Sequence, residues 1–168
     1  LDINELLKQQ VQLIQRTFNY YHIEIGLVEG SEIVFHVGAG ELWEQSGFQA
    51  VPSRLKMGKE GITGRVAATG KPLVVPDVSK EPSYIPVEGS RTRSELTVPI
   101  MVKGQVIGVL DVESDRPDDF DETDLEVIMS LANQTGIAIE NARLFAETQR
   151  LLKKTEQRAN ELTIINNV

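Results

Sequence analysis

Apolar residues recur with helical spacing at both ends of the chain. In residues 2–19 they lie three or four positions apart, at Leu6, Leu7, Val11, Ile14 and Phe18. This spacing predicts a helix with one apolar face, and Asp2 is placed to cap its first turn. Residues 120–167 have a helical pattern almost throughout, and Asp121 followed by Asp124 predicts its N-terminal cap. We therefore expect one helix at each end of the chain.

Between these helices, six segments have the length and the apolar, β-branched content of strands. They are residues 20–28, 31–37, 51–57, 72–77, 94–102 and 105–114. The first two should pair through a tight turn at Glu29-Gly30, and the last two through Lys103-Gly104. An antiparallel sheet of five to six strands, with both terminal helices on one face, is an α+β fold.

The glycine-rich stretch GKEGITGRVAATGKP, residues 58–72, has the ingredients of a phosphate-binding loop. Such a loop needs four residues between its first glycine and a Gly-Lys-Ser/Thr triplet. Here five residues separate Gly64 from Gly70-Lys71, and Pro72 occupies the position where serine or threonine is required. The spacing instead predicts a short helix over 62–70 that ends in a left-handed cap at Gly70.

Composition limits the function further. The 168 residues suit one domain with some flanking structure, and the net charge of −8 disfavours nonspecific binding to nucleic acid or anionic membrane. No apolar run approaches the roughly 20 residues of a membrane span. The absence of cysteine removes disulfides and thiolate catalysis. Because the sequence begins at Leu1 without a signal peptide, we expect a cytoplasmic segment of a longer protein.

Two segments resemble the GAF family of small-molecule sensor domains. Residues 61–78 contain Gly-Ile-x-Gly, and residues 93–144 contain Val-Pro-Ile, Gly-Val-Leu and the closing helix. The resemblance covers about 1–144. It implies a sensor domain over 1–147, with a ligand pocket on the sheet face away from the helices, under loops and short helices. Residues 148–168 are similar to the coiled-coil helix that connects such domains to the next module.

Several chemistries of this family are not expected here. Its bilin photoreceptors attach their pigment through cysteine, and its free methionine sulfoxide reductases use catalytic cysteines, which this chain lacks. Of the cyclic-nucleotide motif, only Phe120, Asp121 and Glu122 match, without the preceding Asn-Lys pair. We therefore expect no cysteine-linked bilin, no cyclic GMP and no enzymatic activity in the domain itself.

The resemblance to the sulfoxide reductases nevertheless suggests a ligand class. In those proteins, acidic residues on two strands hold the amino group of the substrate, and Glu95, Asp111 and Glu113 occupy the matching positions. The period of two places Asp111 with Glu113 on one face, and Glu95 with Thr97. Buried carboxylates are costly unless they are paired or hydrated. The pocket therefore suits an amine-bearing or other cationic ligand.

A structural alternative stays open for these carboxylates, which could pair with Arg91 or Arg93 or cap loop backbone. The long polar loop 79–93 is a candidate lid over the pocket. Aromatic residues in the predicted roof segments could line the pocket or pin the loops to the sheet. They are Trp43, Phe48 and Tyr84. Asp77, directly after a predicted strand, could serve either purpose.

The two histidines suggest a metal or haem ligand. With a turn at Glu29-Gly30, Val28 pairs with Ser31 and His22 faces Val37, so His22 and His36 point to opposite faces. A slip by one residue would instead bring them opposite each other. A metal site needs more than two ligands, so we interpret both histidines as structural and expect neither metal nor haem.

The last helix has apolar and polar residues at alternating spacings of four and three, which indicates a coiled-coil seam. The seam positions are Leu144, Thr148, Leu151, Thr155, Arg158, Leu162 and Ile165. Polar seam residues suit a helix that shifts between packings, and a parallel homodimer is expected, with a solvated linker helix as the alternative.

Together these features predict a regulatory domain that binds a small molecule and signals through a dimeric helix. The parent would be a signalling protein such as a histidine kinase of a two-component system, or a cyclase. The alternative is a dimerisation spacer whose pocket has lost its ligand.

Overall fold

The computed structural model describes residues 2–45 and 53–167. The helices are α1 (Ile3–Phe18), α2 (Glu41–Gln45), α3 (Gly61–Thr69) and α4 (Glu122–Asn166), with a 3-10 turn at Val78–Lys80. The strands are β1 (His22–Glu29), β2 (Glu32–Gly40), β3 (Ser53–Lys56), β4 (Leu73–Val75), β5 (Ser94–Val102) and β6 (Gln105–Ser114). The predicted α+β fold is confirmed, with six strands in the sheet.

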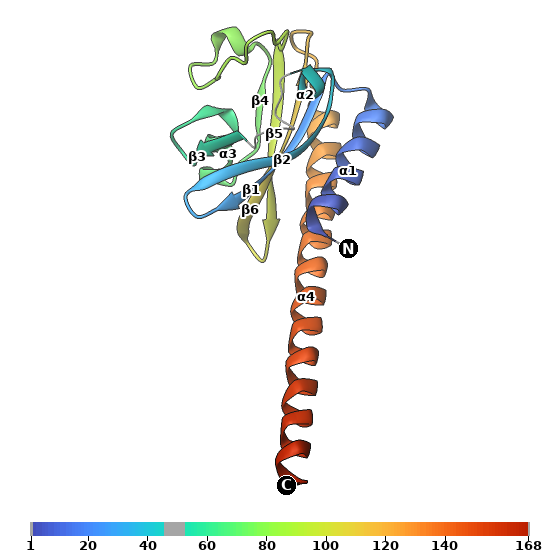
Figure 1. Ribbon diagram of the computed structural model, residues 1–168. Helices are drawn as coiled ribbons and strands as arrows, with labels where there is room; N and C mark the ends of the chain where they lie inside the picture. Colours follow the sequence, from blue (N-terminus) through green and yellow to red (C-terminus); the bar gives the residue numbers. More distant parts are fainter. Residues whose placement is uncertain (1, 46–52, 168) are drawn as a thin grey trace.

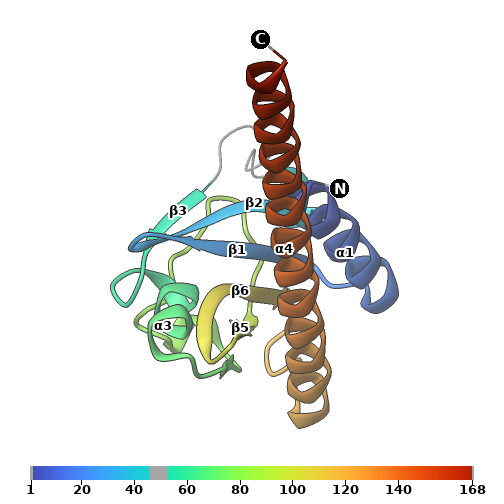
Figure 2. The ribbon, with the colours of Figure 1, turned by 90° about the horizontal axis from the view of Figure 1, so that it is seen from below.

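All strand pairs are antiparallel, in the order β3-β2-β1-β6-β5-β4. Helix α1 packs on β1 and β2, and the first half of α4 packs on β5 and β6. The two helices contact each other and cover one face of the sheet, whereas α3 lies on the opposite face (Figures 1 and 2). The expected placement of both terminal helices on one face is confirmed.

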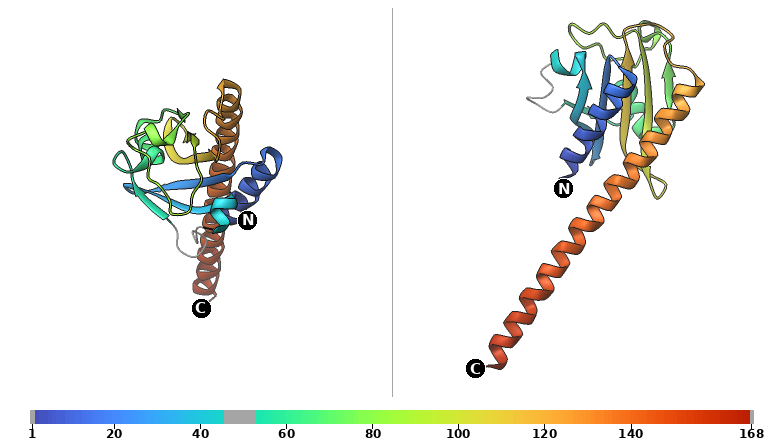
Figure 3. Two further views of the ribbon diagram at one scale, coloured as in Figure 1. Left: turned by 90° about the horizontal axis from the view of Figure 1, so that it is seen from above. Right: turned by 90° about the vertical axis from the view of Figure 1, so that its right-hand side faces the viewer.

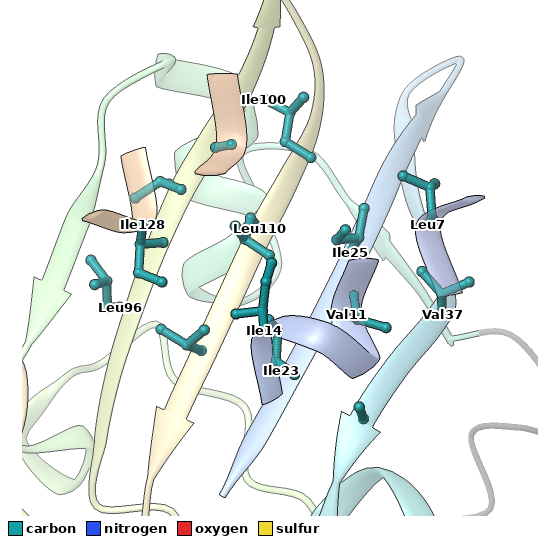
Figure 4. Packing of buried hydrophobic residues seen from close by; sticks show 14 of the residues in the cluster. Leu7, Val11, Ile14, Ile23, Ile25, Val37, Leu96, Ile100, Leu110 and Ile128 are labelled. Carbon is teal, nitrogen blue, oxygen red and sulfur yellow. The ribbon is translucent and has the colours of Figure 1, made fainter. Parts of the chain in front are cut away.

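The main core lies between this helical layer and the sheet. Apolar side chains from α1, α4 and four strands meet there (Figure 4). Residues labelled in that view are Leu7, Val11, Ile14, Ile23, Ile25, Val37, Leu96, Ile100, Leu110 and Ile128. Since side chains alternate along a strand, the residues between these apolar positions point to the other face. The central strands thereby present polar side chains away from α1 and α4.

The predicted register of the first hairpin is wrong. Glu29 pairs with Glu32, so the turn lies at Gly30-Ser31, and Gly30 supplies its left-handed φ of 64°. The moved turn shifts the partner of His22 from Val37 to Ala39, and a β-bulge beside His36 shifts it by one further residue to Gly40. One extra residue in β2 has therefore changed which side chains face each other.

The predicted short helix is confirmed as α3. Gly70 ends it in the left-handed conformation, with its N–H 2.8 Å from the Val66 carbonyl oxygen. Helix α4 begins with a capping box in which Asp121 and Asp124 each accept the other's backbone N–H, as expected.

Beyond the sheet, α4 continues as a single projecting helix, and residues 143–167 are exposed (Figure 3, right). At about 1.5 Å per residue, this section extends for nearly 40 Å. In the described part of the chain, no helix is long and apolar enough to cross a membrane.

Candidate functional site

Three neighbouring strands place six polar side chains on the sheet face away from α1 and α4. We call them the polar cluster: His22 and Glu24 of β1, Asp111 and Glu113 of β6, and Glu95 and Thr97 of β5. The register arranges them in two rows. Glu113 lies between His22 and Glu95, and Asp111 lies between Glu24 and Thr97. The period-two relation predicted within β5 and β6 extends to β1 in the structure.

Hydroxyl groups satisfy part of this cluster. The Thr97 hydroxyl donates to Asp111 and also lies 3.3 Å from Glu95 Oε1. From the loop before β5, the Thr92 hydroxyl donates to Glu113. Each of these carboxyls therefore has a neutral partner, and a hydroxyl supplies no positive charge to balance an ionised carboxylate.

Two polar atoms of the cluster have no hydrogen-bond partner among the described residues. They are Nδ1 of His22 and Oδ2 of Asp111, and both side chains are only 1% exposed. The other ring nitrogen of His22, Nε2, lies 3.4 Å from Glu24 Oε2. Native structures rarely leave such buried atoms unpaired, so they point to a bound water, ion or ligand.

Burial and mutual repulsion shift the pKa values of the cluster. Burial raises the pKa of Glu95 well above its ordinary range, and the charges of Asp111 and Glu113 raise it further. Burial likewise raises the pKa of Asp111, with Glu113 and Glu24 adding to it. The pKa of Glu113 is raised by burial and opposed by His22. The cluster thus carries more acidic groups than it can ionise together.

The imidazole is the basic group of the cluster. Burial would lower the pKa of His22, but the hydrogen bond and charge of Glu24 outweigh it. Together with Glu113 and Asp111, Glu24 raises the pKa of His22 to about 9. One imidazole therefore lies among four carboxyl groups, those of Glu24, Glu95, Asp111 and Glu113.

A cavity of about 100 Å³ opens above the polar cluster. Its walls include Leu42 of α2, Ile62 and Thr63 of α3, and Tyr84 and Ile85 of the segment after the 3-10 turn. The apolar walls exclude part of the solvent, which strengthens electrostatic interactions at the floor. The predicted ligand pocket under loops and short helices therefore has a counterpart here, although it is small.

The predicted site residues fall into two groups. Glu95, Asp111, Glu113 and Tyr84 line the cavity, and Thr97 is fully buried and bonded to Asp111. Trp43 and Asp77 are described but do not line the cavity, and Phe48 is outside the described residues.

Asp77 does not line the cavity, because its carboxylate accepts the Ser79 N–H at 3.1 Å and caps the 3-10 turn. Trp43 is buried beside His22, with ring centroids 6.2 Å apart, and is not one of the cavity walls. Phe48 lies outside the described residues. The two described aromatics thus have separate roles: Tyr84 lines the cavity, and Trp43 of α2 packs beside His22.

The proposed pairing of the acids with arginine is not found. Arg91 lies 2.7 Å from Glu41 and 3.5 Å from Asp115, and its guanidinium stacks on Tyr21. Within the described ranges, Arg93 forms no ion pair with the cluster either. Among the described residues, arginine therefore does not balance the carboxyl groups of the cluster.

Sequence reasoning missed Glu24 and underestimated His22. The signal was present, since Glu24 lies two residues after His22 in a strand and shares its face. What the sequence left open was which strand lies beside β1. His36 is remote from this site, with Nε2 3.5 Å from Glu29 Oε1 at the other end of the hairpin.

Comparisons with known proteins agree with this architecture. A sequence profile described as GAF domain matches residues 1–140. The chain is 27% identical over 172 residues to the Nif-specific regulatory protein of Azospirillum brasilense, a match that covers 96% of this chain and 27% of that protein. It is 28% identical over 182 residues to the circadian input-output histidine kinase CikA of Thermosynechococcus vestitus, covering 97% and 24%.

The fold also matches a solved enzyme. With the X-ray structure of the Neisseria meningitidis free methionine-R-sulfoxide reductase in complex with its substrate, the TM-score is 0.74 at 30% identity, covering 85% of this chain and 81% of that one. The chain spans only about a quarter of the two regulatory relatives. Similar proteins therefore include both signalling proteins and an enzyme, and this chain belongs to the GAF domain family.

Proposed function

We propose that this domain is a regulatory sensor that binds a small cationic ligand, such as an amine, above the polar cluster. One observation carries the proposal: four carboxyl groups and one imidazole are gathered at the floor of a cavity, and none of the described residues that line it is an arginine or lysine. Burying this charge unbalanced is costly, and a cation would offset the cost. Binding energy is therefore available to a ligand of the right charge.

The size of the cavity restricts the ligand. A volume of about 100 Å³ is below the usual range of roughly 300–1,000 Å³ for drug-sized ligands. It suits a small ligand that has an amino group and a short side chain. A larger ligand would fit only if residues 81–93, which form the roof of the cavity, moved. Tyr84 and Ile85 come from that segment, so ligand size and roof position are coupled.

The route from the cavity to the output helix is short. Strand β5 carries Glu95 and Thr97 on the cavity face, and its far end packs directly against α4. At that contact a Cβ added to Gly136 would lie 2.7 Å from the Met101 carbonyl oxygen. A ligand that favours one position of β5 would therefore bias the packing of α4, provided its affinities for the two states differ.

The projecting half of α4 is the proposed transmitter. Leu144, Leu151, Leu162 and Ile165 are between 49% and 69% exposed along one seam. Ile137, seven residues before Leu144, is also 63% exposed and extends that seam toward the domain. A second copy of the helix would cover this stripe as a parallel coiled coil. We infer a homodimer whose helices lead to an output module of a cytoplasmic regulator or histidine kinase.

A dimerisation spacer is the second candidate. It is favoured by the small cavity and by Thr92 and Thr97, which already supply hydrogen bonds to two of the acids. Catalysis has less support, although one structural relative is a reductase. This chain has no cysteine, so a thiol mechanism is not open to it.

Isothermal titration calorimetry of the 168-residue chain with small amines and amino acids tests the proposal. We expect binding of an amino acid, loss of binding for its N-acetyl counterpart, and at least about 10-fold weaker binding to Asp111→Asn, because the cation loses a charged partner. Glu126→Gln, on the exposed face of α4, is the matched control. Equal affinities for amine and acetylated ligand, or no binding across the panel, would favour the spacer.

A further inference from the structure

Within the polar cluster, one imidazole and two carboxylates are arranged as a set of metal ligands. His22, Asp111 and Glu113 each offer one ligand atom, and these atoms all lie within 4.8 Å of one another. All three side chains are buried, with exposed fractions of 1%, 1% and 9%. They come from only two strands, β1 and β6, whose pairing holds them in place.

A second observation points to a ligand at the same place. His22 Nδ1 and Asp111 Oδ2 are the buried atoms of the cluster that lack hydrogen-bond partners among the described residues. Both residues line the cavity. Each atom carries a lone pair when the imidazole is neutral and the carboxyl is ionised, which is the state that a metal ion binds.

The surrounding groups match the outer shell of a metal site. Metal-binding histidines generally donate their second ring N–H to a carboxylate, and Glu24 Oε2 lies 3.4 Å from His22 Nε2. The carboxylates are held in the same manner, Asp111 by the Thr97 hydroxyl and Glu113 by that of Thr92. One nitrogen of His22 and one oxygen of each carboxyl are thereby fixed, and His22 Nδ1 and Asp111 Oδ2 remain without a partner among the described residues.

We propose that His22, Asp111 and Glu113 bind a divalent first-row transition ion such as zinc. An imidazole nitrogen favours these ions over calcium or magnesium, which prefer oxygen ligands throughout. At bond lengths of about 2.0–2.2 Å, the ligand atoms of a tetrahedral ion lie about 3.3–3.6 Å apart, so the side chains need to converge by at most about 1.5 Å when the ion binds. Three protein ligands leave coordination positions open toward the cavity.

This inference does not rest on the proposed amine ligand. The metal and the amine would use Asp111 and Glu113 in common, so they would compete for the site. The test therefore uses metal alone: the 168-residue chain is treated with chelator, dialysed and titrated with zinc by calorimetry, and with cobalt by visible absorption.

The chain has two histidines, which provide a matched pair of variants. We expect one ion per chain, with the dissociation constant raised at least about 10-fold in His22→Gln and unchanged in His36→Gln, since His36 lies on the surface beside Glu29. Asp111→Asn, which keeps the size of the side chain, should weaken binding to a similar extent. It carries the test even where His22→Gln fails to fold, as judged by circular dichroism.

Cobalt adds a readout that simple charge attraction would not produce. Bound to nitrogen and oxygen in a low-symmetry site, it should give an absorption band that Asp111→Asn removes. No stoichiometric binding, or binding that is lost in His36→Gln and kept in His22→Gln, would overturn the proposal.

Discussion

At the scale of single residues, the carboxyl groups of the polar cluster are the unusual feature of this domain. Glu95, Asp111 and Glu113 are at least nine-tenths buried, and the hydrogen bonds that they accept come from the neutral hydroxyls of Thr92 and Thr97. Such a site costs folding free energy in the absence of a cation. The cost depends on pH, because protonation removes the repulsion.

We expect the stability of the metal-free, ligand-free chain to fall as the pH rises from about 5 to 9. The three acids and His22 all have raised pKa values in the folded state, so the folded chain holds more protons than the unfolded one in this window. Stability is therefore greatest at mildly acidic pH. It decreases as the pH rises through the folded-state pKa of each of these groups. For His22, whose pKa rises from 6.5 to about 9, the loss is on the order of 3 kcal/mol.

Urea unfolding at a series of pH values measures this decline. Asp111→Asn should be more stable than the parent chain at pH 8 and show a shallower decline, because one titrating acid is gone. Glu126→Gln should follow the parent curve. A stability that increases over the same window would show that the acids are ionised in the folded chain.

At the scale of elements, the contact between α4 and β5 is set by a missing side chain. Gly136 lies in the interior of α4, where alanine would be favoured by about 1 kcal/mol on helix propensity. Its place is explained by the Met101 carbonyl oxygen, which a Cβ would approach to 2.7 Å. Moving the backbone of β5 away would disrupt its pairing in the sheet, so the close packing of α4 on β5 requires glycine at this position.

We predict that Gly136→Ala destabilises the chain by about 1–2 kcal/mol, because overpacking outweighs the gain in helix propensity. Thermal or urea unfolding measures it. Asn133→Ala, on the exposed side of the same helix, gains propensity without a clash and should be neutral or slightly stabilising. If both variants were equally stabilised, α4 would not be held against β5 at this point, and the proposed coupling route would lose its support.

At the scale of the whole molecule, the chain has a compact domain and a helix that extends far beyond it (Figure 3). The exposed apolar residues of that helix are difficult to explain in a monomer, since isolated helices draw most of their stability from packing. Two neighbouring leucines distinguish the possible faces. Leu151 lies on the proposed seam, whereas Leu152 does not, and they are 49% and 53% exposed.

We expect Leu151→Glu to raise the dimer dissociation constant at least about 10-fold, since each dimer loses two buried leucines. Leu152→Glu should leave it unchanged. Sedimentation equilibrium on both variants gives the answer. The reverse result would place the interface on the face of Phe145 and Leu152, and two unchanged variants would indicate the solvated linker helix.

The sequence predicted the elements well and the polar cluster in part. Helical spacing and caps located α1, α3 and α4, and the apolar runs located the strands, because these signals are local. The acids on β5 and β6 were found for the same reason, with help from the family resemblance. Glu24 was missed because its significance depends on a strand that lies more than eighty residues away along the chain.

The local pattern of this sequence was therefore enough to establish an α+β domain, its capped helices and its lack of thiol chemistry. Tertiary structure decided the rest. Only the pairing of β1 with β6 brings His22 and Glu24 beside Asp111 and Glu113, and only the hairpin turn together with the bulge beside His36 sets which residue lies opposite His22. Strand register is a long-range property, since a shift by one residue turns every side chain to the opposite face. The chemistry of the site depends on which face each carboxyl occupies.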